Sequence, residues 1–241
     1  NSQVRNVTIL HTLLGFVISF LLVFRTNTAY ERWWEGRKQW GALVNSSRNL
    51  AMKLSALLPP EHPARAFFRQ MIPAYAETLK NHLRSEQSRI ALFDKLPPDV
   101  QLRLDTEKHL PNQVALMMYQ KVHALQTEGH ISGEQLLFLN EQLQDFTDIC
   151  GACERIRNTP IPFSYTVFIK KFIFFYIATL PFGFVFSLGY YVIPIVTFIF
   201  YVLASLELIA EEIEEPFGSD ENDLPMDKIA HNIQAHIHEL I

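Results

Sequence analysis

The stretch "FLLVFRTNTAYERWWEGRKQW", residues 20–40, begins with side chains that dissolve in lipid and ends with charged side chains that require water. No proline or glycine interrupts the chain between Gly15 and Gly36, so the stretch is expected to lie within one helix. A helix from about Val7 to about Ala42 would be roughly 54 Å long, well beyond the thickness of a bilayer. The sequence therefore predicts a helix that crosses a membrane and continues into water.

The average composition conceals this segregation. Of the 241 residues, 49% are apolar and 19% are charged, which is typical of a soluble protein. However, Lys, Arg, Asp and Glu are absent from residues 6–24 and from residues 172–206. As helices these segments would span about 28 Å and about 52 Å, enough for one and for two membrane crossings, with Gly189 at the turn. The alternatives for the first segment are a signal peptide and a buried core helix, but no cleavage site of small residues follows it.

Basic residues around these segments predict the topology. Arg25, Arg32, Arg37 and Lys38 follow the first segment, and Lys170 and Lys171 precede the second. The positive-inside rule then places residues 25–171 in the cytoplasm, and the C-terminus with them. Three crossings would leave the start of the chain outside, which suggests that an earlier membrane helix preceded Asn1.

The polar part of the chain is expected to be helical. Apolar residues recur at three- and four-residue steps in residues 133–150: Leu136, Leu139, Leu143, Phe146 and Cys150. Pro59–Pro60 and Pro97–Pro98 indicate turns between helices, and Pro73 indicates a kink or break. The predicted fold class is all-α, in which integral membrane helices are continuous with a cytoplasmic helical domain.

Three tryptophans lie just after the first apolar segment. Trp33, Trp34 and Trp40 suit a membrane interface or a contact between helices, where the ring is buried and its N–H finds a partner.

Three motifs together resemble the bacterial branch of the bestrophin family: "FRTNTAYERWWEGRKQWGALVNSSRNLA", "RNTPIPFSY" and "EEIEEPFGSDENDLPMD". The resemblance extends from about Gly15 to the end of the chain. It implies a homopentameric ion channel around a central pore, in the lipid bilayer of the bacterial inner (plasma) membrane. It also implies four segments. These are a pore-lining membrane helix (1–30), a cytoplasmic helical domain (31–162), two further membrane helices (163–208), and a cytoplasmic acidic turn with a C-terminal helix (209–241). The family's first membrane helix has no counterpart here.

Two places are expected to narrow this pore. Phe16, Phe20 and Phe24 form one stripe along the first helix. On their own, most such stripes are explained by packing between helices or by a lipid-facing surface. The resemblance places the stripe at the neck of the channel. Ile161 lies between two prolines, so the chain cannot continue as a helix there, and it enters the next helix at Phe163. The resemblance assigns Ile161 to a cytoplasmic aperture.

An acidic stretch near the C-terminus is a candidate calcium site. Glu212 and Glu215 precede a Pro-Phe-Gly turn, and Asp220 and Asp223 follow it. Calcium takes six to eight oxygen ligands, which such a stretch could supply. Animal bestrophins have a calcium clasp at the matching place, built on an unbroken acidic run, whereas Ser219 and Asn222 interrupt the run here. The alternative is a solvated acidic turn.

Other signals do not point to chemistry. Cys150 and Cys153 have the C-x-x-C spacing, but they continue a helical apolar stripe and no βαβ unit surrounds them. The histidines of the C-terminal segment, His231, His236 and His238, do not share one helical face and fit an amphipathic helix. The net charge is −4 and no basic patch is concentrated, so a nucleic-acid partner is not expected. Neither a phosphate-binding loop nor a hydrolase or metalloprotease motif is found, so an enzyme is not predicted.

The sequence leaves three functions open. A passive channel for small monovalent ions is favoured. A secondary transporter would be expected to show an inverted repeat and a charged midplane site, and a membrane-anchored scaffold would not need a pore. The acidic balance tilts the expected selectivity slightly toward sodium or potassium, while the positive edges of aromatic rings would favour chloride.

Overall fold

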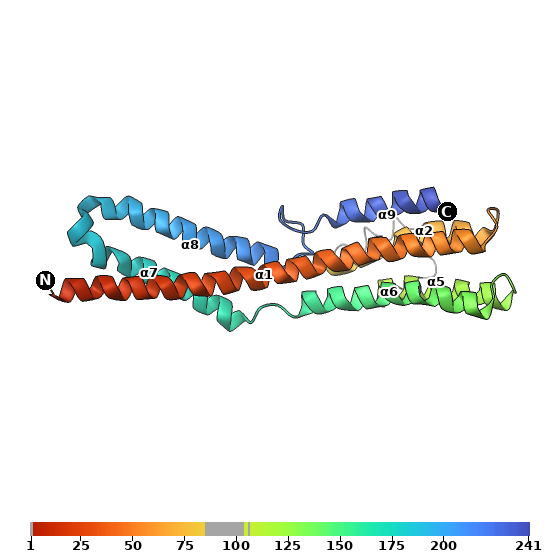
Figure 1. Cartoon of the computed structure of the whole chain (residues 1–241), viewed down its shortest axis with the longest axis horizontal. Coiled ribbons are helices and arrows are strands. Elements are labelled where there is room, and N and C mark those ends of the chain that lie inside the picture. Colours follow the sequence, from red (N-terminus) through yellow and green to blue (C-terminus); the bar gives the residue numbers. More distant parts are fainter. Residues whose placement is uncertain (1, 85–103, 106) are drawn as a thin grey trace. The chain divides into compact units, whose positions relative to one another are not determined.

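The protein is described by a computed structural model that covers residues 2–84, 104–105 and 107–241. Within these residues every regular element is a helix (Figure 1). The elements are α1 (Ser2–Leu57), α2 (Pro63–Arg84), α5 (Leu110–Thr127), α6 (Gly133–Asn158), α7 (Phe163–Leu188), the 3₁₀ turn η1 (Gly189–Tyr191), α8 (Val192–Glu214) and α9 (Met226–Leu240). The all-α prediction is confirmed for this part of the chain. The turn predicted at Pro97–Pro98 lies outside the described residues.

Helix α1 is longer than the sequence suggested. It runs from Ser2 to Leu57 without a break, whereas the prediction ended it at about Ala42. The reason is that Leu43, Leu50 and Leu54 continue a buried helical stripe. No proline occurs before Pro59, so the turn predicted at Pro59–Pro60 is where α1 ends.

The chain divides into two compact units, and α1 contributes to both. Residues 1–34 and 159–216 form one unit, here called the hairpin unit. Residues 35–158 and 217–241 form the other, here called the bundle unit. The boundaries of the four predicted segments refer to placement in a bilayer and stay predictions.

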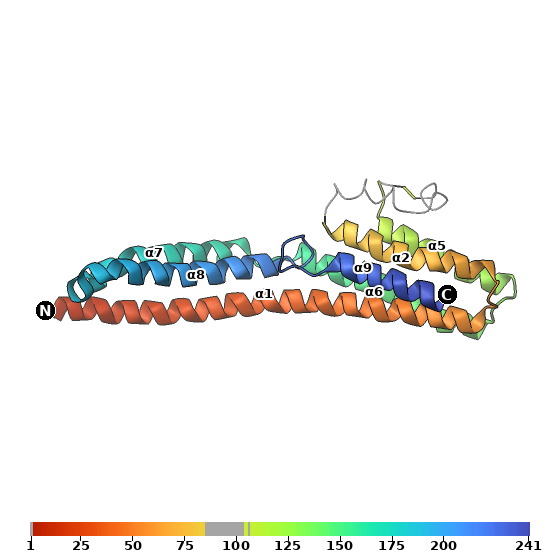
Figure 2. The same ribbon diagram turned by 90° about the horizontal axis from the view of Figure 1, so that it is seen from above.

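The hairpin unit consists of the first part of α1 with α7 and α8. Helices α7 and α8 lie side by side and are joined at η1 (Figure 2). Gly189 has a φ of 54°, a left-handed conformation that glycine adopts without strain, so the predicted turn is confirmed. The unit is held by a small apolar core: Ile18, Leu22, Ile169, Ile173 and Leu203.

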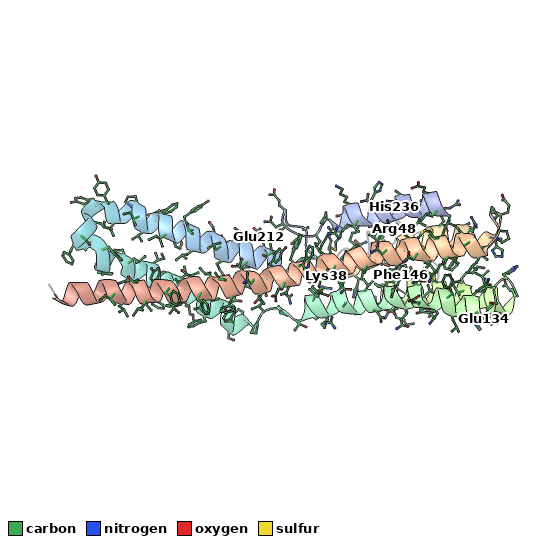
Figure 3. All side chains as sticks on the ribbon, viewed as in Figure 1. Lys38, Arg48, Glu134, Phe146, Glu212 and His236 are labelled. Carbon is green, nitrogen blue, oxygen red and sulfur yellow. The ribbon has the colours of Figure 1, made fainter. Side chains whose placement is uncertain are left out.

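The bundle unit has a larger core. Helix α2 packs against α5 and α9, and α5 packs against α6. A kink or a break was predicted at Pro73. Helix α2 continues through this proline, so a break is wrong, because the residues around it bury an apolar face that holds the helix together, and the kink stays a prediction. On α6 the predicted stripe is confirmed from Leu139 to Cys150. Phe146, labelled in Figure 3, packs edge-on against Tyr75 with ring centroids 4.9 Å apart.

Candidate functional site

The phenylalanine stripe of α1 lies on the exposed face of the hairpin unit. The exposed fractions of Phe16, Phe20 and Phe24 are 71%, 54% and 51%. The rings touch along the helix, with centroid distances of 6.2 Å between the first two and 4.7 Å between the last two. The stripe is therefore a continuous aromatic surface about 12 Å long.

The buried face of α1 lies on the opposite side of the helix. Ile18 and Leu22 pack into the core of the hairpin unit, and each lies about 160° around the helix from Phe20. Ala29, which is fully buried, lies about 180° from Phe20. Packing against α7 and α8 thus aims the phenylalanines away from the rest of their own unit.

Exposed aromatic side chains also occur elsewhere in the hairpin unit. Phe182 and Phe186 of α7 are 77% and 83% exposed, and Phe198 of α8 is 66% exposed. Such surfaces are stable only against lipid or against another subunit. Exposure by itself therefore does not distinguish a pore-lining ring from a lipid-facing ring.

The face that carries the phenylalanines changes character at its end. Asn27 and Glu31 are exposed, and each lies within about 20° of Phe20 around the helix. Glu31 lies about 10 Å along α1 from Phe24. An apolar stripe is thus followed on the same face by an amide and then by a carboxylate.

Ile161 lies in the short connection between α6 and α7, as predicted from its flanking prolines. Its side chain is half-buried, and its backbone N–H donates a hydrogen bond to Oε1 of Glu214 at 2.7 Å. Because Glu214 ends α8, this bond fixes the connection to the end of another helix.

The same glutamate is paired with an arginine of α1. Nη2 of Arg25 lies 2.7 Å from Oε2 of Glu214, and its Nε lies 3.7 Å from Oε1 of Glu207. The side chain of Arg25 is 0% exposed. One carboxylate therefore joins the residue that follows the phenylalanine stripe to the backbone of Ile161.

A second arginine strengthens this junction. Nε of Arg32 donates to the backbone carbonyl of Glu214 at 3.0 Å, and its Nη1 donates to the carbonyl of Thr159. Sequence reasoning used Arg25 and Arg32 only as markers of topology. Their structural role had one visible signal, since Glu207 is the first acid after a long apolar segment and needs a cationic partner.

The four acids of the predicted calcium site fall in both units. Glu212, labelled in Figure 3, and Glu215 lie at the end of α8 in the hairpin unit. Asp220 and Asp223 lie in the bundle unit, where the N–H of Asp220 donates to Oδ2 of Asp223 at 2.7 Å. The calcium site stays a prediction.

The two cysteines lie on α6, and the C-terminal histidines lie on α9. Cys150 and Cys153 are free and buried on α6, and burial raises the pKa of the Cys150 thiol to about 12. A thiol that stays protonated is a weak nucleophile and metal ligand. His231 and His238 are exposed on α9, which is the predicted amphipathic helix.

Comparison with known proteins gives the family. The family model for bacterial and fungal bestrophin proteins matches residues 2–239. This chain belongs to the bestrophin family. The voltage-dependent anion channel-forming protein of Synechocystis is 35% identical over 231 residues, which are 94% of this chain and 75% of that protein. The namesake protein of Escherichia coli is 34% identical over 223 residues, which are 92% of this chain and 73% of that protein.

Solved bestrophin structures have the same fold. A bacterial bestrophin homologue from Klebsiella pneumoniae superposes with a TM-score of 0.89 at 29% identity, covering 95% of this chain and 86% of that one. This bestrophin is accordingly a membrane protein of a channel-forming family rather than an enzyme. Its long apolar helices contain segments of mean hydropathy 1.9 in α1 and 2.3 in the α7–α8 hairpin.

Proposed function

We propose that five copies of this bestrophin form a channel that passes small monovalent ions across the bacterial plasma membrane. In this proposal the stripe of Phe16, Phe20 and Phe24 is the neck, Ile161 is the aperture, and most of the chain lies in the cytoplasm. The observation that carries it is the stripe itself, which faces away from the packed side of α1 in a chain of a channel-forming family.

An apolar neck can control ion flow without a charged gate. Five copies of each phenylalanine would form three successive rings that offer an ion no ligands in place of its water. A narrow ring of this kind excludes water when closed and conducts when it widens. Phe20 and Phe24 lie in edge-on contact, with ring centroids 4.7 Å apart, so neighbouring rings of the stripe form one apolar surface.

The aperture depends on the junction described above. Glu214 binds the N–H of Ile161 through one oxygen and pairs with Arg25 through the other. We infer that this junction holds the aperture at a set position relative to the end of the neck helix. Arg25 and Glu214 are positioning residues in this proposal.

The sign of the charge carrier follows from the residues next to the neck. Five copies of Glu31 would place a ring of carboxylates about 10 Å beyond the last phenylalanine. Such a ring attracts cations, so we propose that sodium or potassium passes more readily than chloride. Anion selectivity is the second candidate, because curated relatives are named voltage-dependent anion channel-forming proteins.

The test is the reversal potential of the purified protein in a planar bilayer under a potassium chloride gradient. Values near the cation equilibrium potential support the proposal, and Glu31→Gln should then lower the cation-to-anion permeability ratio by about threefold or more. A reversal potential near the chloride equilibrium potential would contradict cation selectivity and show that the channel passes anions instead. A pentamer verified by native mass spectrometry that carries no current in either polarity, before and after widening of the neck by Phe20→Ala, would contradict a channel and favour a scaffold.

The neck assignment has its own control. Phe20→Ala should raise the conductance, whereas Phe186→Ala, which removes an even more exposed ring from α7, should leave it unchanged. Equal effects of the two substitutions would assign the phenylalanine stripe to lipid contact.

A further inference from the structure

Two histidines and a glutamate, none of them a proposed pore residue, converge in the bundle unit. His82 lies in the last turn of α2, His109 caps the N-terminus of α5, and Glu154 lies on α6. Each histidine Nε2 lies 2.6 Å from the same oxygen, Oε1 of Glu154. The three potential ligand atoms all lie within 4.8 Å of one another.

We propose that His82, His109 and Glu154 form a binding site for a divalent transition metal of the zinc class. Two imidazole nitrogens and one carboxylate oxygen are a ligand set that zinc favours, and three protein ligands leave a fourth position for water. The side chains are 14%, 31% and 30% exposed, so the ion can reach the site from solvent.

Insertion of an ion would change the distances between these ligand atoms. Ligand atoms at about 2.0–2.1 Å from a tetrahedral zinc lie about 3.3 Å from one another. The two contacts of 2.6 Å would therefore open by about 0.7 Å each. The two imidazole rings already lie close, with centroids 4.4 Å apart and an interplanar angle of 56°.

The protonation states also suit metal binding. Burial lowers the pKa of His82, although the bond to Glu154 opposes this, and a lowered pKa favours the neutral imidazole. Burial acts to raise the pKa of Glu154, but hydrogen bonds from His109 and His82 outweigh it and lower the pKa. A metal needs neutral imidazoles and an ionised carboxylate.

Metal binding would break one existing hydrogen bond, at the N-terminus of α5. Nδ1 of His109 accepts a hydrogen bond from the backbone N–H of Asn112 at 3.2 Å. A histidine that binds metal through Nε2 carries its proton on Nδ1, so this long cap bond would be lost. In return the ion would join the end of α2, the start of α5 and the C-terminal part of α6, and so stabilise the bundle unit.

The experiment titrates zinc chloride into the full-length, detergent-solubilised protein prepared without a polyhistidine tag. We expect one tightly bound zinc per chain and a higher melting temperature with zinc than with EDTA. Glu154→Gln and His82→Ala should weaken binding by tenfold or more. His130→Ala is the matched control, because His62 and His130 form another close ring pair, with centroids 4.5 Å apart. This control should bind zinc as the unchanged protein does.

The visible absorption of bound cobalt keeps the test independent of folding of the variants. An intense spectrum typical of four or five ligands in the unchanged protein, displaced by one equivalent of zinc, supports the site. A weak six-coordinate spectrum, unaltered binding in Glu154→Gln, or no zinc retained would overturn the proposal and leave a hydrogen-bonded cluster.

Discussion

In the bundle unit several large aromatic side chains lie fully buried in the core, whereas in the hairpin unit many lie on the surface. Trp40, Tyr75 and Phe146 are 0% exposed, but Phe16 and Phe186 are 71% and 83% exposed. The pattern for charge is reversed: among the described residues, the arginine that is fully buried is Arg25, and it lies in the hairpin unit. One continuous helix, α1, takes part in both arrangements.

The difference follows from the solvent that each unit is built for. In water, burial of apolar surface drives packing and aromatic rings go inside. In lipid, apolar side chains gain little from burial, while charged groups must be paired within the protein. The same residue type therefore has opposite roles in the two units, and substitutions can test this directly.

The largest effect on stability is expected for a core phenylalanine of the bundle unit. Phe146→Ala removes a fully buried ring and its edge-on contact with Tyr75, and should lower the free energy of unfolding by about 3–5 kcal/mol. Phe20→Ala should lower it by less than about 1 kcal/mol, because that ring is 54% exposed. Denaturation in detergent, followed by tryptophan fluorescence, measures both. Equal losses would contradict the contrast between the units.

The buried charge of the hairpin unit comes next. Arg25→Ala leaves Glu214 and Glu207 without their buried counter-charge and should cost about 3 kcal/mol. The control is Arg48→Ala, since Arg48 (labelled in Figure 3) is exposed, and its loss should cost less than about 0.5 kcal/mol. The melting temperatures of the two purified variants measure this difference in stability. Similar melting temperatures would mean that the ion pairs of Arg25 do not stabilise the hairpin unit.

Substitution of two glycines of α1 should lower the free energy of unfolding by intermediate amounts and so compare how tightly the two units are packed. A Cβ on Gly36 would lie 3.1–3.2 Å from the packed side chains of Phe217 and Leu224, so Gly36→Ala should cost about 1–2 kcal/mol. In the hairpin unit, a Cβ on Gly15 meets only the hydroxyl end of Tyr176 closely, and that end can move. Gly15→Ala should therefore cost less in the same denaturation experiment. A larger loss at Gly15 would show that the hairpin unit is the more tightly packed of the two.

The smallest expected effect is a pH dependence in the bundle unit. Burial acts to raise the pKa of Asp227, but hydrogen bonds from Lys80 and Arg84 outweigh it and lower the pKa. A lowered folded pKa stabilises the fold above the ordinary aspartate pKa of about 4, and this contribution is lost as the pH falls through the lowered value. Because the carboxylate is 63% exposed, the effect should be below about 1 kcal/mol. The difference in melting temperature between the unchanged protein and Asp227→Asn should shrink from pH 7 to pH 3, and a constant difference would contradict this.

The sequence by itself determined the helical class, the apolar segments, the glycine turn and the proline loop around Ile161. These features depend on local properties: hydrophobic periodicity, the length of apolar segments, and the backbone limits of proline and glycine. The stripe of Phe16, Phe20 and Phe24 could also be recognised, because helical spacing alone brings its members onto one face. Local rules were insufficient for the end of α1 and for Pro73, where packing of neighbouring residues extends the helix.

Only the tertiary structure decided which distant groups meet. Arg25 and Glu214 are far apart in the chain, as are His82 and Glu154, and no spacing rule relates them. The partner expected for the N–H of buried Trp40 is not found among the described residues. The physical reason is that a pairing between helices depends on their register and rotation, which the whole core sets at once. A local pattern can state that Glu207 needs a partner, but the packed helices select Arg25.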